Sequence, residues 1–318
     1  MKPAREWSGT LSRRTGRSRS IGYALRKTLH KPQFWFGVVA LVPMFIWYAV
    51  FSFWSVIQAV RIALINYHVL NPARSHFVGL ANFRNLLNDP IFPIALKNSI
   101  AWGALGIVVG IPLALAVALC LGNVRHGRNL YQTLIFVPVV LSLVSVVLLI
   151  QYLLDPQTGP IDNILTALHL PTSTFLFRSS TALPTAVGIG IWKGIGVNII
   201  ILTAGLLNIP SEVTDAARID GANEWRRLWH ITLPLLQPTL NLILILGMIG
   251  ALQEFTLPQV LTGGGPDNAT LLLNIYIYNL AFQTLQFSQA AAAALVEFAI
   301  TLGLTLVTLR LTRIRWSY

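Results

Sequence analysis

Apolar residues gather into six long blocks along the chain, separated by shorter polar stretches. The blocks run, in chain order, from Phe34 to Val60, Ile100 to Leu121, Leu130 to Leu154, Ala182 to Leu207, Thr239 to Leu261 and Ala290 to Leu309. Each holds about 20 residues or more, enough for an α-helix to cross the roughly 30 Å hydrocarbon core of a bilayer. Lipid offers the backbone no hydrogen-bond partner, so such a span must be helical. The pattern predicts an all-α integral membrane protein of about six transmembrane helices.

Four prolines lie within or near the ends of these blocks: Pro43, Pro112, Pro138 and Pro184. Proline removes a helical hydrogen bond, so we expect these helices to be kinked at or near the prolines.

Composition supports a membrane class. Of the 318 residues, 54% are hydrophobic and 11% are charged, whereas soluble domains usually carry about 25% charged residues. The single cysteine, Cys120, lies inside an apolar block and can form no intrachain disulfide.

The segment before the first block is basic. Residues 1–33 contain Arg5, Arg13, Arg14, Arg17, Arg19, Arg26, Lys27 and Lys31. A signal peptide is the alternative, but the following block of about 27 residues is too long for a signal-peptide core. We therefore divide the chain into a basic N-terminal tail, 1–33, and a transmembrane domain, 34–318, which includes a polar loop at 208–238.

The net charge of +12 is typical of a protein that binds nucleic acid or anionic lipid, or of one whose basic loops set its topology. If the N-terminus is cytoplasmic, most lysines and arginines lie on the inner side, in the tail, after the second and fourth blocks, and at the C-terminus. The positive-inside rule then predicts that both termini are cytoplasmic. Because topology explains the charge, we expect no nucleic-acid partner.

The loop at 208–238, NIPSEVTDAARIDGANEWRRLWHITLPLLQP, has the local pattern of two short helices. Ser211 is placed to cap the first helix, Gly221 to end it, and Asn223 to cap the second. Local pattern alone leaves three interpretations open: a DNA-binding helix–turn–helix, an amphipathic hairpin on the lipid surface, or a docking element for a soluble partner.

The same loop resembles a motif of the membrane (permease) subunits of binding-protein-dependent ABC importers. That motif is E-A-A, three residues, G, nine residues, I-x-L-P. Here it reads Asp215-Ala216-Ala217, three residues, Gly221, nine residues and Ile231-Thr232-Leu233-Pro234, with Asp replacing Glu as the only departure. The segments LTAGLLNIP, IDGAN, ITLPLLQP, FVGLANFRNLL and LTGGGPDNAT are similar to the carbohydrate-uptake branch, which includes the membrane subunits of the maltose importer.

The resemblance implies that residues Asp215 to Gly221 form a coupling helix seated in a groove of an ATPase subunit. In that arrangement Gly221 permits a sharp turn, Ala216 and Ala217 permit close approach, and Asp215 offers a hydrogen-bond or ionic contact. The expected partners are a second homologous permease subunit, two ATPase subunits, an extracytoplasmic solute-binding protein and a sugar-type substrate, in the cytoplasmic membrane of a bacterium or archaeon. ATP and Mg²⁺ are expected on the ATPase, with no cofactor bound by this chain. A homodimer remains the alternative to a heterodimer.

Polar residues inside apolar blocks are costly and usually face a cavity. The candidates for a substrate pathway are Gln253, Glu254, Trp192, Lys193, Asn198 and Asn241, with Gln151 and Glu297 as further ones. Gln253 and Glu254 rank first because the corresponding span lines the pathway in similar sugar permeases. Each residue has a plainer alternative, a hydrogen bond within the helix bundle or a position near the interface.

Other functions receive less support from the sequence. The run Gly263-Gly264-Gly265-Pro266 lacks the Gly-Lys-Ser/Thr of a nucleotide-binding loop. All six histidines lie outside the apolar blocks, so a metal site of the H-E-x-x-H type within the spans is not expected. An enzyme is therefore not predicted. A secondary carrier or channel for a small polar solute remains the alternative, and it would have no need of the structured inner loop.

Overall fold

The computed structural model describes residues 32–69, 71–124, 126–169 and 174–311. Most of the basic tail and the last seven residues lie outside this part. The chain divides into two units, residues 1–58 and 59–318, and each is described by itself.

The first unit contains α2 (Pro32–Tyr48) and a π-helical turn, Ala49–Phe53. α3 (Trp54–Ala63) continues this helix into the second unit. Residues 35–63 form one apolar helix long enough to cross a membrane, which confirms the first predicted span.

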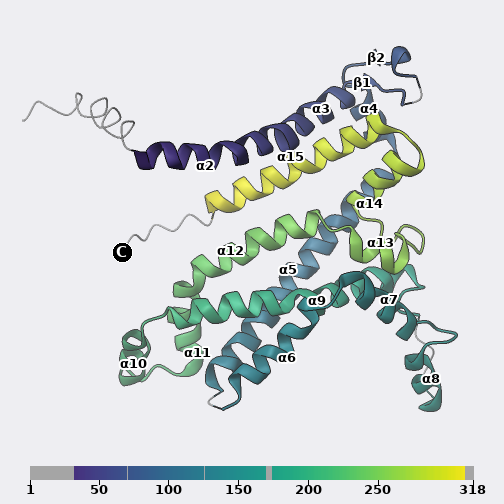
Figure 1. The fold of residues 1–318 in the computed structure, drawn as a ribbon. Coiled ribbons are helices and arrows are strands. Elements are labelled where there is room, and N and C mark those ends of the chain that lie inside the picture. The colour runs from purple at the N-terminus through teal and green to yellow at the C-terminus, as the bar shows by residue number, and fades with distance from the viewer. Residues whose placement is uncertain (1–31, 70, 125, 170–173, 312–318) are drawn as a thin grey trace, which may run out of the picture. The chain divides into compact units, whose positions relative to one another are not determined.

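The second unit is built on four long helices. They are α5 (Ile91–Asn123), α9 (Ser179–Leu207), α12 (Leu233–Leu252) and α15 (Phe287–Leu311). α5 packs along α9 and against α12, and α12 also packs against α15 (Figure 1). Buried Ala114, Leu202 and Leu236 lie where α5, α9 and α12 meet. In the described residues five helices are long and apolar enough to span a membrane, or six if a bent pair counts as one span. The predicted all-α fold of about six spans is confirmed.

The third predicted span is bent rather than straight. α6 (Arg128–Val140) and α7 (Leu143–Leu153) meet at an angle of 91°, with Leu141 and Ser142 in non-helical conformations between them. The segment is rich in valine, whose branched side chain loses rotamer freedom in a helix. Hydropathy is additive over a window and does not locate this break. The sequence predicts only a kink at or near Pro138, and the break follows that proline at Leu141 and Ser142.

The fifth predicted span also has different limits. One helix of 29 residues runs from Glu224 to Leu252, and Gln253 ends it. A separate helix, α13 (Thr256–Thr262), follows. Phe255 breaks the helix with φ −138° and ψ −52°, and the Glu254 side chain accepts a hydrogen bond from the Leu257 N–H. A continuous helix from Thr239 to Leu261 is therefore wrong, because a local cap starts a new helix.

Short elements lie at the end of the second unit away from α10 (Figure 1). β1 (Ile65–Asn66) pairs antiparallel with β2 (His76–Phe77), and a 3₁₀ turn, Pro72–Arg74, lies between them. α4 (Ala81–Asn88) follows, and Asn82 Nδ2 donates to the carbonyls of Ala63 and Ile65. α8 (Pro160–Ala167) lies in the connection between α7 and α9.

α14 (Leu273–Tyr278) and a π-helical turn, Asn279–Gln283, connect α13 to α15. Two hydrogen bonds join this connection to α5 and to the residues just before it. Ser99 Oγ on α5 accepts from the Leu273 N–H at 2.8 Å, and Tyr276 Oη donates to Asp89 Oδ2 at 2.7 Å. The glycine run before α14 forms a turn in which Gly263 and Gly264 have positive φ.

Candidate functional site

A helical hairpin joins α9 to α12. α10 (Ser211–Ile219) is followed by a turn, and α11 (Glu224–Arg227) begins after it. The Ala222 N–H donates to the Ala217 carbonyl at 2.9 Å, and the Gly221 N–H donates to the Arg218 carbonyl at 3.1 Å. This pair of bonds is the Schellman motif, which requires a left-handed residue. Gly221 supplies it with φ +75°, as the sequence predicts.

The second helix of the hairpin begins as predicted, and the first does not. Asn223 Oδ1 accepts from the Arg226 N–H at 2.8 Å, which is the expected N-cap. The residue at the cap position of α10 is Pro210, and its side chain makes no cap bond. Ser211 is the first helical residue instead, so its expected role as the N-cap is wrong.

α11 continues through a π-helical turn, Leu228–Thr232, into α12 without a break. Ile231 and Leu233 are half-buried in this continuous helix, and Pro234 is exposed. The second half of the motif therefore forms the base of a long helix. The hairpin is connected at both ends to long helices of the bundle.

Two residues from the first half of the motif, Asp215 and Ala216, lie on the exposed surface of the hairpin. Asp215 Oδ1 accepts from Arg218 Nη1 at 3.2 Å, and both side chains are exposed. Ala216 is exposed, but Ala217 is buried, with 7% of its surface exposed. Consecutive helical residues point about 100° apart, so the two alanines do not share one exposed face. Ile219 adds an apolar side chain that is 87% exposed.

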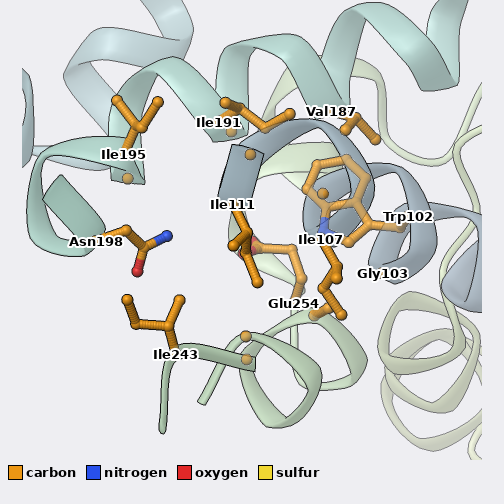
Figure 2. A pocket seen from close by; sticks show the side chains of 17 residues that line it. Trp102, Gly103, Ile107, Ile111, Val187, Ile191, Ile195, Asn198, Ile243 and Glu254 are labelled. Carbon is orange, nitrogen blue, oxygen red and sulfur yellow. The ribbon is translucent and has the colours of Figure 1, made fainter. Parts of the chain in front are cut away.

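A cavity of about 290 Å³ lies between α5, α9 and α12. Figure 2 shows it lined by isoleucines and glycines, with Trp102 at one end and Asn198 at the other. Seven glycines line it: Gly103, Gly106, Gly110, Gly190, Gly194, Gly247 and Gly250.

These glycines act in two ways. Some allow close packing: a Cβ at Gly103 would lie 3.2 Å from the Ala251 Cβ, and one at Gly190 would lie 3.4 Å from the Trp102 ring. Others leave space, because a Cβ at Gly106, Gly194 or Gly250 would meet no atom within 4 Å. The helices therefore approach closely and still leave an open cavity of about 290 Å³ between them, near the lower limit of about 300 Å³ for small-ligand sites.

Polar groups in the cavity come from Glu254, Asn198 and the indole of Trp102. Glu254 lies at the junction of α12 and α13, where its Oε1 accepts the Leu257 N–H at 3.1 Å. Figure 2 shows the Glu254 side chain directed into the space between α5 and α12. Two of the six predicted pathway residues, Glu254 and Asn198, thus line one cavity.

The other four lie elsewhere. Lys193 Nζ donates to the Val139 carbonyl on α6 at 3.1 Å. Trp192 lines a separate apolar cavity of about 560 Å³ formed with α5 and α6. Gln253 is an exposed residue at the end of α12, and Asn241 is half-buried on α12 outside the cavity lining. Glu297 is also outside the lining and accepts from Asn274 Nδ2 at 3.0 Å.

Sequence reasoning missed Trp102 and the glycines. A signal was present, because Gly103, Gly106 and Gly110, and again Gly190 and Gly194, recur at the three- or four-residue spacing that places residues on one helix face. Small residues at this spacing are typical of close helix packing in membranes.

The structure combines long apolar helices, a cavity between three of them and a helical hairpin that joins two of these three. The chain belongs to the family described as binding-protein-dependent transport system inner membrane component, whose model matches residues 106–315. It is therefore a multi-pass inner-membrane permease subunit.

Curated relatives resemble nearly the whole chain. The probable ABC transporter permease protein YurN of Bacillus subtilis is 30% identical over 85% of this chain and 93% of its own length. The multiple sugar-binding transport system permease protein MsmF of Streptococcus mutans is 30% identical, covering 91% and 98%. The sn-glycerol-3-phosphate transport system permease protein UgpA of Agrobacterium fabrum is 30% identical, covering 87% and 94%.

Solved structures agree on the fold. A chain of a bacterial ABC transporter involved in the import of the acidic polysaccharide alginate matches with a TM-score of 0.81 and 25% identity, covering 91% of this chain and 98% of that chain. A chain of an alginate ABC transporter in complex with an alginate pentasaccharide-bound periplasmic protein matches with a TM-score of 0.80 and 24% identity, covering 92% and 97%.

Proposed function

We propose that this permease subunit forms half of the pathway for a sugar, oligosaccharide or sugar derivative, in an importer driven by ATP hydrolysis on two separate ATPase subunits. The hairpin from Ser211 to Arg227 is the docking element for one ATPase. A second, homologous permease subunit completes the pathway, and an extracytoplasmic solute-binding protein delivers the substrate. The hairpin and both termini face the cytoplasm.

One observation carries this proposal: the hairpin connects two of the three helices that line the cavity. It begins directly after α9 and continues without a break into α12, and both helices supply cavity residues. A displacement of the hairpin by a partner therefore moves two walls of the cavity. That is the mechanical requirement for coupling a soluble motor to a transmembrane pathway.

The contacts inside the hairpin support its role as a rigid lever. The Schellman bonds at Gly221 and the Asn223 cap fix the turn, and Arg227, which is 9% exposed, forms an ion pair with Glu224. Asp215, Ala216 and Ile219 remain exposed for a partner. The sugar class is supported by the transport systems to which similar proteins belong, among them a multiple sugar-binding system and an alginate importer.

The docking surface can be tested with two neighbouring cysteines. In a Cys120→Ser background, Ala216→Cys and Ala217→Cys place a thiol on the exposed and the buried side of α10. A thiol-specific cross-linker should join Ala216→Cys to a co-purifying ATPase subunit and leave Ala217→Cys unjoined. Membrane insertion of both variants is checked by fractionation.

Two results would contradict the proposal. One is that no nucleotide-hydrolysing protein co-purifies with the intact chain. The other is that Ala216→Cys reacts with an impermeant thiol reagent added from the extracytoplasmic side of intact cells. Uptake that is insensitive to vanadate would favour a secondary carrier instead.

A further inference from the structure

The cavity between α5, α9 and α12 is lined by an acidic side chain and by no basic one. Seventeen residues line it, and none of them is lysine, arginine or histidine. Its one charged group is the Glu254 carboxylate, and its other polar side chains are the Asn198 amide and the Trp102 indole. The remaining wall is made of glycine, alanine, valine and isoleucine.

A lysine lies next to this wall in the sequence but does not serve the cavity. Lys193 precedes Gly194, a lining residue, on α9. Its Nζ donates to the Val139 carbonyl on α6, which draws the ammonium group to the other side of α9. Lys193, the basic residue adjacent in sequence to the α9 lining, therefore forms a contact between α9 and α6 and does not reach the cavity.

Glu254 is held in place by the backbone. The Leu257 N–H donates to its Oε1 at the start of α13, and Figure 2 shows the side chain reaching into the cavity from the end of α12. A side chain fixed at this junction adds a negative potential at one position in the pathway. Apolar walls strengthen such a potential because they screen it less than water does.

Recognition of a phosphate or a uronate needs the opposite arrangement. Anionic groups are bound by arginine or lysine donors, often in bidentate geometry. Hydroxyl groups of a neutral sugar can donate to a carboxylate and to an amide oxygen, and can accept from an amide or indole N–H. The cavity offers the second set of partners and lacks the first.

We propose that the cavity of this subunit passes neutral polyhydroxylated solutes and discriminates against phosphorylated and carboxylated ones, with Glu254 as the residue that sets this selectivity. The inference rests on the proposed function, since it assumes that the cavity is part of the pathway. The solutes that it disfavours include those named for the sn-glycerol-3-phosphate system and for the importer of an acidic polysaccharide.

The potential can be measured without knowing the natural substrate. In a Cys120→Ser background, Gly106→Cys and Gly250→Cys each place one thiol in the cavity, where a Cβ meets no atom within 4 Å. Native membranes carrying the full chain are permeabilised and treated with methanethiosulfonates bearing a trimethylammonium, a sulfonate or a neutral hydroxyethyl group. The reaction rate of each reagent with a cavity thiol is divided by the rate of the same reagent with a small free thiol, which removes differences in intrinsic reactivity.

Three Glu254 backgrounds isolate the charge. We expect the cationic reagent to react about tenfold faster than the anionic one at both cavity thiols when Glu254 is present. Glu254→Gln keeps an oxygen that can accept the Leu257 N–H and should bring the ratio close to one. Glu254→Lys should reverse it. Gly122→Cys, exposed on α5 outside the cavity lining, is the control whose ratio should not respond to Glu254→Gln.

Two other outcomes have different meanings. Equal rates for both charged reagents, or a preference for the anion, with Glu254 present would overturn the selectivity while leaving the pathway intact. A failure of the neutral reagent at both cavity thiols, with normal reaction at Gly122→Cys, would show that the cavity is not aqueous. That result would overturn the proposed pathway together with the inference.

Discussion

Lys193 Nζ donates a 3.1 Å hydrogen bond to the carbonyl of Val139, and this bond joins α9 to the last turn of α6. The final carbonyls of a helix have no partner within the helix, and α6 ends at Val140, immediately before the 91° bend into α7. Lys193 therefore supplies a donor where the bend leaves a carbonyl in need of one. A charged residue inside an apolar helix here has a structural explanation.

Lys193→Met should destabilise the protein without altering selectivity. The substitution keeps a long apolar stem and removes the donor, which should cost about 1–2 kcal/mol. The measurement is the melting temperature of the purified full chain in detergent, beside initial uptake per folded molecule. Loss of uptake at unchanged stability would contradict this account and restore Lys193 as a substrate contact.

The contact between α6 and α9 also depends on Gly196. A Cβ at this position would lie 2.9 Å from the Ile135 carbonyl oxygen and 2.9 Å from Val139 Cγ2. Because a backbone oxygen cannot move aside easily, Gly196→Ala should be less stable than wild type by about 1–3 kcal/mol.

Gly188→Ala is the matched control for this prediction. It lies on the same helix, gains the same helix propensity, and its Cβ would meet no atom within 4 Å. The two alanine variants are compared by thermal unfolding. Equal melting temperatures would show that α6 and α9 do not approach as closely as described.

Asn274 links three helices through one amide group. Its Nδ2 donates to the Leu252 carbonyl at the end of α12 and to Glu297 Oε1 on α15, both at 3.0 Å. Glu297 is only 8% exposed, so a variant without this donor leaves a buried carboxyl group without its hydrogen bond from Asn274. Asn274→Leu should cost about 2–4 kcal/mol.

A double variant tests whether the loss comes from Glu297. Asn274→Leu with Glu297→Met removes both polar groups, and replacing a whole buried pair costs less than breaking it. The double variant should therefore melt at a higher temperature than Asn274→Leu alone. A double variant less stable than either single one would refute the pairing.

Much of the fold follows from the sequence because lipid imposes strict limits on it. About 20 apolar residues are needed per span, and the six blocks satisfy this. The break at Ser142 and the new start at Thr256 were not predictable in this way. They depend on local backbone conformation and on a cap from Glu254, neither of which changes the average hydropathy.

The candidate site was predicted only where a local residue preference determines the structure. Gly221 was found because a left-handed turn has a local residue preference. Polar residues within spans were found as a set, but their directions were not. Lys193 and Asn198 are five residues apart, about 140° around the helix, so they cannot face the same side. The structure places Asn198 at the cavity and Lys193 at α6.

The central claim is that the hairpin moves the cavity helices when an ATPase moves the hairpin, and Gly221 tests it most directly. Asparagine tolerates a left-handed conformation, whereas proline fixes φ near −65° and cannot adopt the observed +75°. A Cβ at this position would meet no atom within 4 Å. A steric clash of the Cβ therefore does not explain a difference between the asparagine and proline variants.

The decisive measurement is ATP-dependent uptake by vesicles carrying the complete transporter with Gly221→Asn or Gly221→Pro, at matched amounts of inserted protein. We predict that Gly221→Asn retains most of the uptake and that Gly221→Pro abolishes it. Normal uptake with Gly221→Pro would contradict the account, because a disrupted turn would then still transmit the work of ATP hydrolysis.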